Sequence, residues 1–189
     1  NRIDVLIGIT KLEEEPYKKT TSYDEGQPNI LLDFDLNHSY QDRNINPDNF
    51  DDPIKGWNAL DRATKLHEEV LKKLAKMFHR KNLPIKKSVH IDFYTEYKNR
   101  GKLFEIKTFN NSNFNQQIRH GIIQLKEYYF KYAKYTDTIL KETDLFLLLN
   151  DNPEKNINDI QLNFLKDQKI KLCWIKDNNV ISFNKETLF

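Results

Sequence analysis

Three charged residues lie at a spacing that could perform chemistry on a phosphate. Residues 92–108 read DFYTEYKNRGKLFEIKT, with Asp92 in the first half and Glu105 and Lys107 inside an apolar run of the second half. Alternation along a β-strand places Glu105 and Lys107 on one face and the apolar residues on the other. Because a polar turn separates the two halves, the first half is expected to fold back beside the second. The carboxylates of Asp92 and Glu105 would then lie close together.

Two neighbouring carboxylates repel each other unless a cation lies between them. A hard divalent ion such as Mg²⁺ suits this arrangement, because it takes one or two carboxylates and completes its shell with water and phosphate oxygens. Lys107 would position the attacking water or neutralise charge that develops on a phosphate. Together the three residues predict cleavage of a phosphodiester bond. The alternative is an ordinary solvent-exposed Glu-x-Lys pair with no catalytic role.

A polar stripe on a following segment strengthens the catalytic interpretation. Residues 116–134, QQIRHGIIQLKEYYFKYAK, have helical periodicity, and Gln117, Gly121, Gln124 and Tyr128 recur along one side at steps of three and four. Glutamines beside a small residue are unfavourable to bury unless they face a site. The stripe is therefore expected to complete the site formed by the three charged residues.

The remaining pattern predicts an α/β fold in which helices flank one mixed sheet. Alternation predicts a β-hairpin over residues 88–97 and 102–109, joined by the turn signal KNRGK. An almost wholly apolar run at 144–149 predicts a strand that is buried on both faces. Helices are expected at 57–80, 116–134 and 157–168, and a closing pair of strands at 170–175 and 180–183.

The first part of the chain is harder to interpret. Two short apolar runs, at 3–10 and 29–36, stand between segments rich in Asn, Asp, Pro and Gly that read as loops. We expect residues 1–56 to form an N-terminal extension that adds strands or provides recognition or dimer contacts. Residues 57–189 are expected to form the core domain.

The segment FEIKT, a polar linker and then QIRHGIIQLKEYYF resemble the PD-(D/E)XK nuclease superfamily, in the branch whose third motif is a glutamine in a Gln-Leu-x-Glu-Tyr helix. The match covers roughly residues 57–150. It implies the restriction-endonuclease-like αβββαβ core, Mg²⁺ or Mn²⁺ as the cofactor, and DNA as the partner.

The resemblance also implies roles for individual residues. Asp92 and Glu105 would bind the metal, and the carbonyl of Ile106 would be a further oxygen ligand. Lys107 would be the catalytic lysine, and Gln124 would complete the catalytic set. The chain departs from the family pattern at the position before the aspartate, where an isoleucine replaces the proline.

The segment at 57–80 adds auxiliary candidates. His67 falls near the middle of its apolar face and Glu68 at the edge. Similarity to relatives with an arginine and a histidine at this place implies that His67 or Glu68 reaches the metal site or a phosphate. A satisfied core histidine is the alternative for His67. On the other helix, Gln117 and Tyr128 are the auxiliary candidates.

Composition limits the setting of this chemistry. The 189 residues have the length of one domain, and their net charge of +2 neither requires nor excludes a nucleic-acid partner. No apolar run approaches about 20 residues, so no membrane span is expected. Cys173 is the only cysteine, which excludes an internal disulfide and favours a reducing cytoplasm. The start at Asn1 rather than methionine is expected of a piece of a longer protein.

The sequence thus predicts a Mg²⁺-dependent endonuclease that acts on DNA. Analogy with relatives indicates a bacterial restriction or anti-phage defence protein, working in the cytoplasm as a homodimer or within a larger multidomain assembly. Two alternatives stay open. One is an RNase or a branched-DNA repair nuclease with the same core, and the other is a non-catalytic nucleic-acid-binding or assembly module of that fold.

Overall fold

The computed structural model describes residues 31–36, 53–88, 90–136, 138–183 and 188. In this part of the chain, seven strands form one sheet and three α-helices cover it. The strands are β1 (Leu32–Asp33), β2 (Lys86–Lys87), β3 (Phe93–Tyr97), β4 (Arg100–Lys107), β5 (Thr143–Leu149), β6 (Ile170–Lys176) and β7 (Asn179–Ser182). The helices are α1 (Pro53–His79), α2 (Phe114–Tyr129), which a π-helical segment continues over Phe130–Tyr135, and α3 (Asp159–Asp167).

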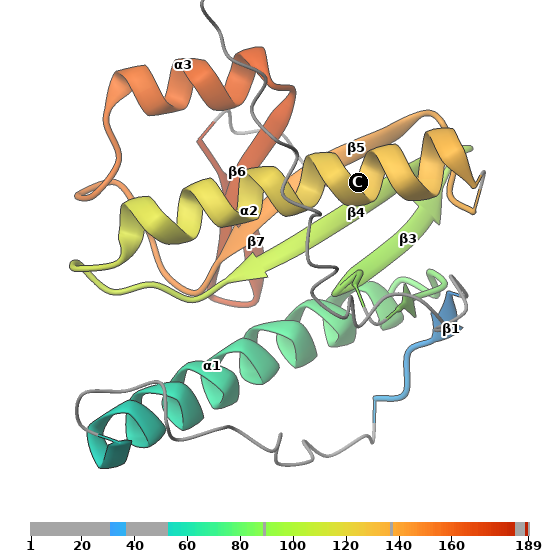
Figure 1. Ribbon diagram of the computed structural model, residues 1–189. Coiled ribbons are helices and arrows are strands. Elements are labelled where there is room, and N and C mark those ends of the chain that lie inside the picture. Colours follow the sequence, from blue (N-terminus) through green and yellow to red (C-terminus); the bar gives the residue numbers. More distant parts are fainter. Residues whose placement is uncertain (1–30, 37–52, 89, 137, 184–187, 189) are drawn as a thin grey trace, which may run out of the picture.

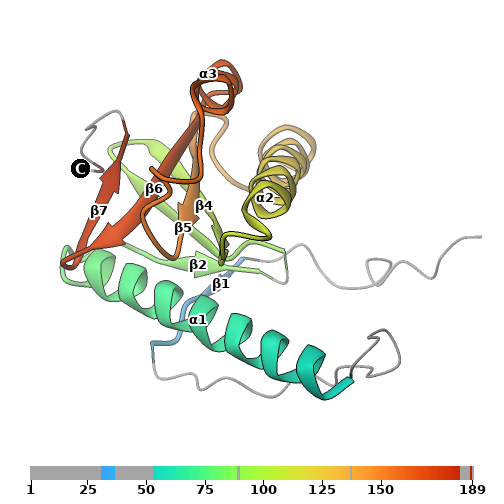
Figure 2. The same cartoon turned by 90° about the vertical axis from the view of Figure 1, so that its left-hand side faces the viewer.

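The sheet is mixed, and its strand order follows the order of the chain from β1 to β7. β4, β5 and β6 run parallel to one another, whereas the other neighbouring pairs are antiparallel. α2 connects β4 to β5, and α3 connects β5 to β6. Both helices lie on one face, and α1 covers the other (Figures 1 and 2). The predicted mixed sheet between helices is confirmed, and the elements from α1 to β5 follow the order helix, three strands, helix, strand.

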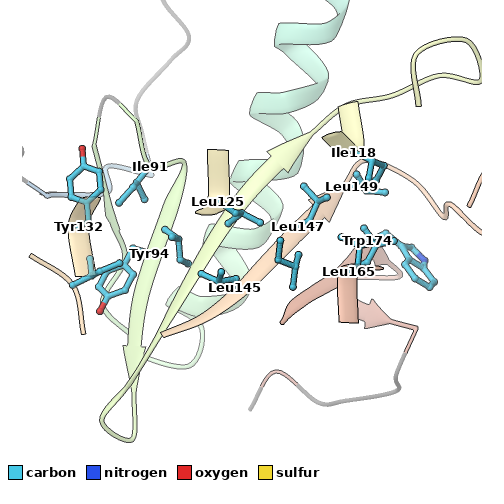
Figure 3. Packing of buried hydrophobic residues seen from close by; sticks show 14 of the residues in the cluster. Ile91, Tyr94, Ile118, Leu125, Tyr132, Leu145, Leu147, Leu149, Leu165 and Trp174 are labelled. Carbon is cyan, nitrogen blue, oxygen red and sulfur yellow. The ribbon is translucent and has the colours of Figure 1, made fainter. Parts of the chain in front are cut away.

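A separate apolar cluster fills the space on each face of the sheet. Figure 3 shows the cluster under α2 and α3, which includes Ile118, Leu125, Leu145, Leu147, Leu149, Leu165 and Trp174. The cluster under α1 includes Val70, Leu71, Leu74, Phe78, Phe93, Phe104, Ile106, Phe146, Leu148 and Cys173. Successive residues of β4 and β5 enter opposite clusters, as strand alternation requires. Cys173 is fully buried, as a small apolar residue would be.

Two tight hairpin turns depend on residues with positive φ. Lys98 and Asn99, with φ of 50° and 59°, join β3 to β4, while Asp177 and Asn178, with φ of 50° and 57°, join β6 to β7. Two consecutive left-handed residues match the twist of an antiparallel ribbon, and Asn and Asp tolerate this region. The first turn is shorter than the predicted KNRGK, because β4 already begins at Arg100.

The N-terminal extension is described only in part. The apolar run at 3–10 lies outside the described residues, and the run at 29–36 contributes β1, whose Leu32 pairs with Lys87 of β2. A piece of the extension therefore joins the same sheet as the core. Among the helices that the structure describes, none has the length and apolar character needed to cross a membrane.

Gly101 lies inside β4, where a larger residue would not fit. A Cβ atom there would collide with Oγ1 of Thr143 and come within 2.9 Å of the Tyr94 hydroxyl oxygen. We therefore expect Gly101→Ala to lower the free energy of unfolding by about 1–3 kcal/mol, measured by urea unfolding. Lys98→Gly is the control, because glycine suits the positive φ of the turn and should leave stability equal or higher. Equal stability of Gly101→Ala and the parent protein would contradict this packing.

Candidate active site

A local turn places Asp92 at the start of β3. Oγ of Ser88 accepts hydrogen bonds from the backbone N–H groups of His90 and Ile91, at 3.1 and 3.0 Å. The N–H of Ser88 also donates to the carbonyl of Ile91 at 3.0 Å. Because these bonds occupy the backbone, the strand predicted over 88–97 is interrupted, and Asp92 is the last residue before β3.

The carboxylate of Asp92 links β3, β4 and α1. Its Oδ2 accepts the N–H of Ile106 at 2.9 Å, and Nε2 of His67 lies 3.2 Å from the same oxygen. The described pairing of β3 with β4 starts at Phe93 and Phe104, so Ile106 extends beyond it. The N–H and C=O of a strand residue point to the same edge, and the Ile106 carbonyl therefore faces the Asp92 side as well. Both contacts use Oδ2, and no described residue forms a hydrogen bond with Oδ1.

Glu105 is a carboxyl group inside the sheet, with 3% of its surface exposed. Its Oε1 accepts a hydrogen bond from Nζ of Lys107 at 2.7 Å. Burial and then the charge of Asp92 raise the pKa of Glu105 to about 8, although Lys107 and His67 act in the opposite direction. In these surroundings Glu105 becomes fully ionised near neutral pH only if another cation approaches it.

His67 belongs to this cluster through Asp92. Burial acts to lower the pKa of His67, but the hydrogen bond and charge of Asp92, with contributions from Glu68 and Glu105, raise it above the usual value. The side chain is 29% exposed, so it lies at the border of the apolar face of α1. Glu68 acts on His67 through its charge, and within the described part of the chain it makes no hydrogen bond to the other candidates.

Gly121 lets α2 rest closely on the sheet next to Lys107. A Cβ atom at this position would collide with Cδ1 of Leu147 and come within 3.2 Å of Cγ of Lys107. Glycine therefore fixes how near the helix backbone lies to the end of β4. Ile118 and Leu125, buried on the neighbouring ridge of α2, hold the helix in this place.

Gln124 and Tyr128 continue the same side of α2. Nε2 of Gln124 donates to the Tyr128 hydroxyl at 3.1 Å. Burial raises the pKa of Tyr128 to about 12, and the charges of Glu105 and Asp92 add to the rise while the Gln124 hydrogen bond opposes it. Tyr128 is thus close enough to both carboxylates to respond to their charge. The amide of Gln124 is held by the tyrosine and bonds directly to neither carboxylate.

The structure brings together most, but not all, of the candidate residues. Asp92, Glu105, Ile106, Lys107 and His67 are connected by hydrogen bonds or by their charges, and Tyr128 is coupled to them. Gln117 lies one turn before Gly121 and is half-buried. Its side chain makes no hydrogen bond within the described residues.

Two neighbours of the site were missed by the sequence interpretation. The His90 ring lies against Tyr128 with ring centroids 5.8 Å apart. Asn150 follows β5; its Oδ1 accepts the N–H of Phe109 at 2.8 Å, and its own N–H donates to the carbonyl of Lys107 at 3.3 Å. A polar residue directly after an apolar parallel strand was the available signal for Asn150, because ligand sites gather at the carboxyl ends of such strands.

The oxygen ligands present fit a small divalent cation. Among the described residues, no three His, Cys, Asp or Glu side chains are already arranged to hold a metal ion. Mg²⁺ needs fewer protein ligands, since one or two carboxylates suffice when water and phosphate complete the shell. Mn²⁺ accepts the same oxygen donors. Glu105, whose ionisation is disfavoured by burial and by Asp92, is the group that such a cation would stabilise.

Comparisons of the chain with protein-family models, with curated proteins and with solved structures found no significant match.

The raised pKa of Glu105 predicts a pH-dependent stability in metal-free buffer. Between the ordinary carboxyl value and about 8, the folded protein keeps a proton on Glu105 that the unfolded chain has lost. Stability should therefore fall as the pH rises through this range, by roughly 2–4 kcal/mol from this group. Glu105→Gln lacks the titration, so it should match the parent at pH 5 and exceed it at pH 8.5. Parallel curves of unfolding free energy against pH for the two proteins would contradict the buried, proton-retaining state.

Proposed function

We propose that this protein is a metal-dependent nuclease that hydrolyses phosphodiester bonds in DNA. The observation that carries the proposal is the buried Glu105, close to Asp92 and hydrogen-bonded to Lys107 at 2.7 Å. A charged pair is unfavourable in an apolar interior, and strongly perturbed carboxyl groups gather at sites of catalysis. These residues are also those to which the motif resemblance to PD-(D/E)XK nucleases gives catalytic roles.

In this proposal Asp92, Glu105 and the Ile106 carbonyl hold Mg²⁺ or Mn²⁺. When bound, such an ion would supply Lewis-acid stabilisation of negative charge on the phosphate. His67 contacts Asp92 at 3.2 Å, and it either orients this carboxylate or adds a nitrogen ligand. Cation binding would favour release of the Glu105 proton, because the positive charge offsets both burial and the repulsion from Asp92.

The remaining residues act on water and on the phosphate. Lys107 would orient the attacking water or neutralise charge on the scissile phosphate, from its place beside Glu105. Gln124 and Tyr128, on the helix side of the site, would supply N–H and O–H donors to phosphate oxygens. By the same resemblance we propose restriction or anti-phage defence as the setting, with the chain as the cutting part of a homodimer or a larger assembly.

The activity can be tested with supercoiled plasmid in Mg²⁺ or Mn²⁺. We expect nicking that EDTA abolishes and that Glu105→Ala or Lys107→Ala slows by about 100-fold or more, because each removes a group that acts in the transition state. Lys73→Ala, at an exposed position of α1, is the matched control and should retain the parent rate. Nicking that persists in EDTA or in Glu105→Ala would refute the metal mechanism. Parallel assays on single strands, RNA and branched junctions identify the preferred substrate.

Metal binding can be measured independently of cleavage. At about 100 times its Kd, a cation that binds only the folded protein raises the free energy of unfolding by about 2.7 kcal/mol. For a chain of this length that corresponds to roughly 5–10 °C in Tm. We expect Mn²⁺ to give such a shift at pH 8 in the parent and less than a third of it in Glu105→Gln. An equal shift in both proteins would place the cation elsewhere.

A further inference from the structure

A second group of polar side chains lies on the face of the sheet opposite Glu105. Strand register sets Lys102 of β4 directly across from Thr95 of β3 on one side and Asp144 of β5 on the other. Residues paired in this way point to the same face. Their row lies next to Phe104 and Phe146, which belong to the cluster under α1. The row is therefore on the α1 face, away from the candidate active site.

Among the described residues, Lys102 has no partner for its charge. It is only 8% exposed, and the one polar or ionic contact described for it is with the ring of Phe146, whose centroid lies 5.4 Å from Nζ. In the part of the chain that the structure describes, Lys102 makes no hydrogen bond and no ion pair. A buried ammonium is strongly unfavourable when nothing accepts its protons.

Asp144, which lies across from Lys102, forms ion pairs with other cations. Oδ1 of Asp144 lies 3.1 Å from a guanidinium nitrogen of Arg100 and 3.8 Å from Nζ of Lys171. Nζ of Lys171 also lies 5.5 Å from the centre of the Phe146 ring, the ring that Lys102 contacts. Arg100 and Lys171 thus share the carboxylate of Asp144, and Lys102 lies beside it in the strand register. Glu142, 3.9 Å from Arg100, has a side chain that is 77% exposed, so solvent weakens its contribution.

A hydroxyl beside Lys102 also lacks a partner in the described part of the chain. Oγ1 of Thr95 is fully buried, and no described residue forms a hydrogen bond with it. Two adjacent side chains, one cationic and one a hydroxyl, therefore have donors that nothing in the described structure accepts. Burial, Lys171 and Arg100 all lower the pKa of Lys102, and only Asp144 opposes them. An anion at this place would satisfy both donors and reduce the repulsion among the cations.

We propose that Arg100, Lys102, Lys171 and Thr95, with Asp144 between them, form a binding site for a phosphate group. A phosphate offers several acceptor oxygens to two ammonium groups, a guanidinium and a hydroxyl, and hydrogen bonds of this charge-assisted kind are strong. The group is either free, as inorganic phosphate or a nucleotide, or part of a DNA backbone. This site goes beyond the proposed nuclease function, and it stands whether or not the protein cleaves DNA.

The test is thermal unfolding of the full chain in increasing inorganic phosphate, with ionic strength held constant by NaCl. We expect binding with a Kd of about 1–10 mM and a rise in Tm of roughly 3–6 °C at ten times that concentration. Lys102→Met preserves the length of the side chain and should remove at least two thirds of this rise. Lys73→Met, at an exposed position of α1 and outside both sites, is the control and should retain it.

A second variant, expected to strengthen phosphate binding, tests the site if Lys102→Met fails to fold. Asp144→Asn removes the acid that competes with phosphate for the cations, and should tighten phosphate binding by about 3- to 10-fold. Adenosine monophosphate and a short DNA strand without terminal phosphates, tested in the same way, distinguish a free phosphate from a backbone one. No shift with any of the three ligands would overturn the site. So would shifts that are equal in the parent, Lys102→Met and Asp144→Asn.

Discussion

The burial of one carboxyl group constrains the arrangement of this fold around its centre. Glu105 lies in β4, the middle strand of the seven-stranded sheet, with 3% of its surface exposed and an apolar cluster on each face of the sheet. A group of this kind is tolerated only where charges are paired and hydrogen bonds are made. Lys107 provides the ammonium, and Asp92 with His67 forms a linked pair next to it. The elements that carry these residues must therefore meet at one point, the carboxyl end of β4.

The helices meet that requirement from opposite faces. α1 delivers His67 from below the sheet to the edge where Asp92 lies, and α2 approaches from above (Figure 1). The approach of α2 depends on Gly121, since any side chain there would meet Leu147 and Lys107. The same closeness brings Tyr128 within the electrostatic influence of both carboxylates. A change in helix position would thus alter packing and the protonation of the site together.

Local patterns were enough to predict most of the fold. Alternation located β4 and helical periodicity located α2, because both patterns report which face of an element is buried. The pairing of Glu105 with Lys107 on one face followed from the same rule. Alternation of apolar and polar residues does not reveal where a side chain competes with a neighbouring strand for backbone hydrogen bonds. The Ser88 hydroxyl captures backbone N–H groups and ends the strand that alternation extended across Asp92.

Contacts between distant segments were the other limit. Lys102 looks in the sequence like the solvated beginning of a strand, because a polar turn at 98–100 comes shortly before it. Lys102 packs against Phe146, which lies 44 residues later in the chain. The residues around Lys102 in the sequence do not predict this contact. The hydrogen bond from Ile106 to Asp92 was equally unforeseeable, since it depends on where β3 stops pairing with β4. Motif spacing identified the candidate residues, but their hydrogen-bond and packing partners depend on how the strands assemble into the sheet.

The order of the strands has a consequence for how the protein is made. Among the described strands, each one from β2 onward pairs with the strand synthesised just before it, so a nascent chain leaving the ribosome can add it to an edge that already exists. No gap has to be held open for a later segment, which keeps loop closure short and favours rapid assembly. The residues of the candidate site all lie before β5, so they have emerged before the last three strands are translated. β5 then brings Leu147, against which α2 packs at Gly121, so the later strands complete the packing around these residues.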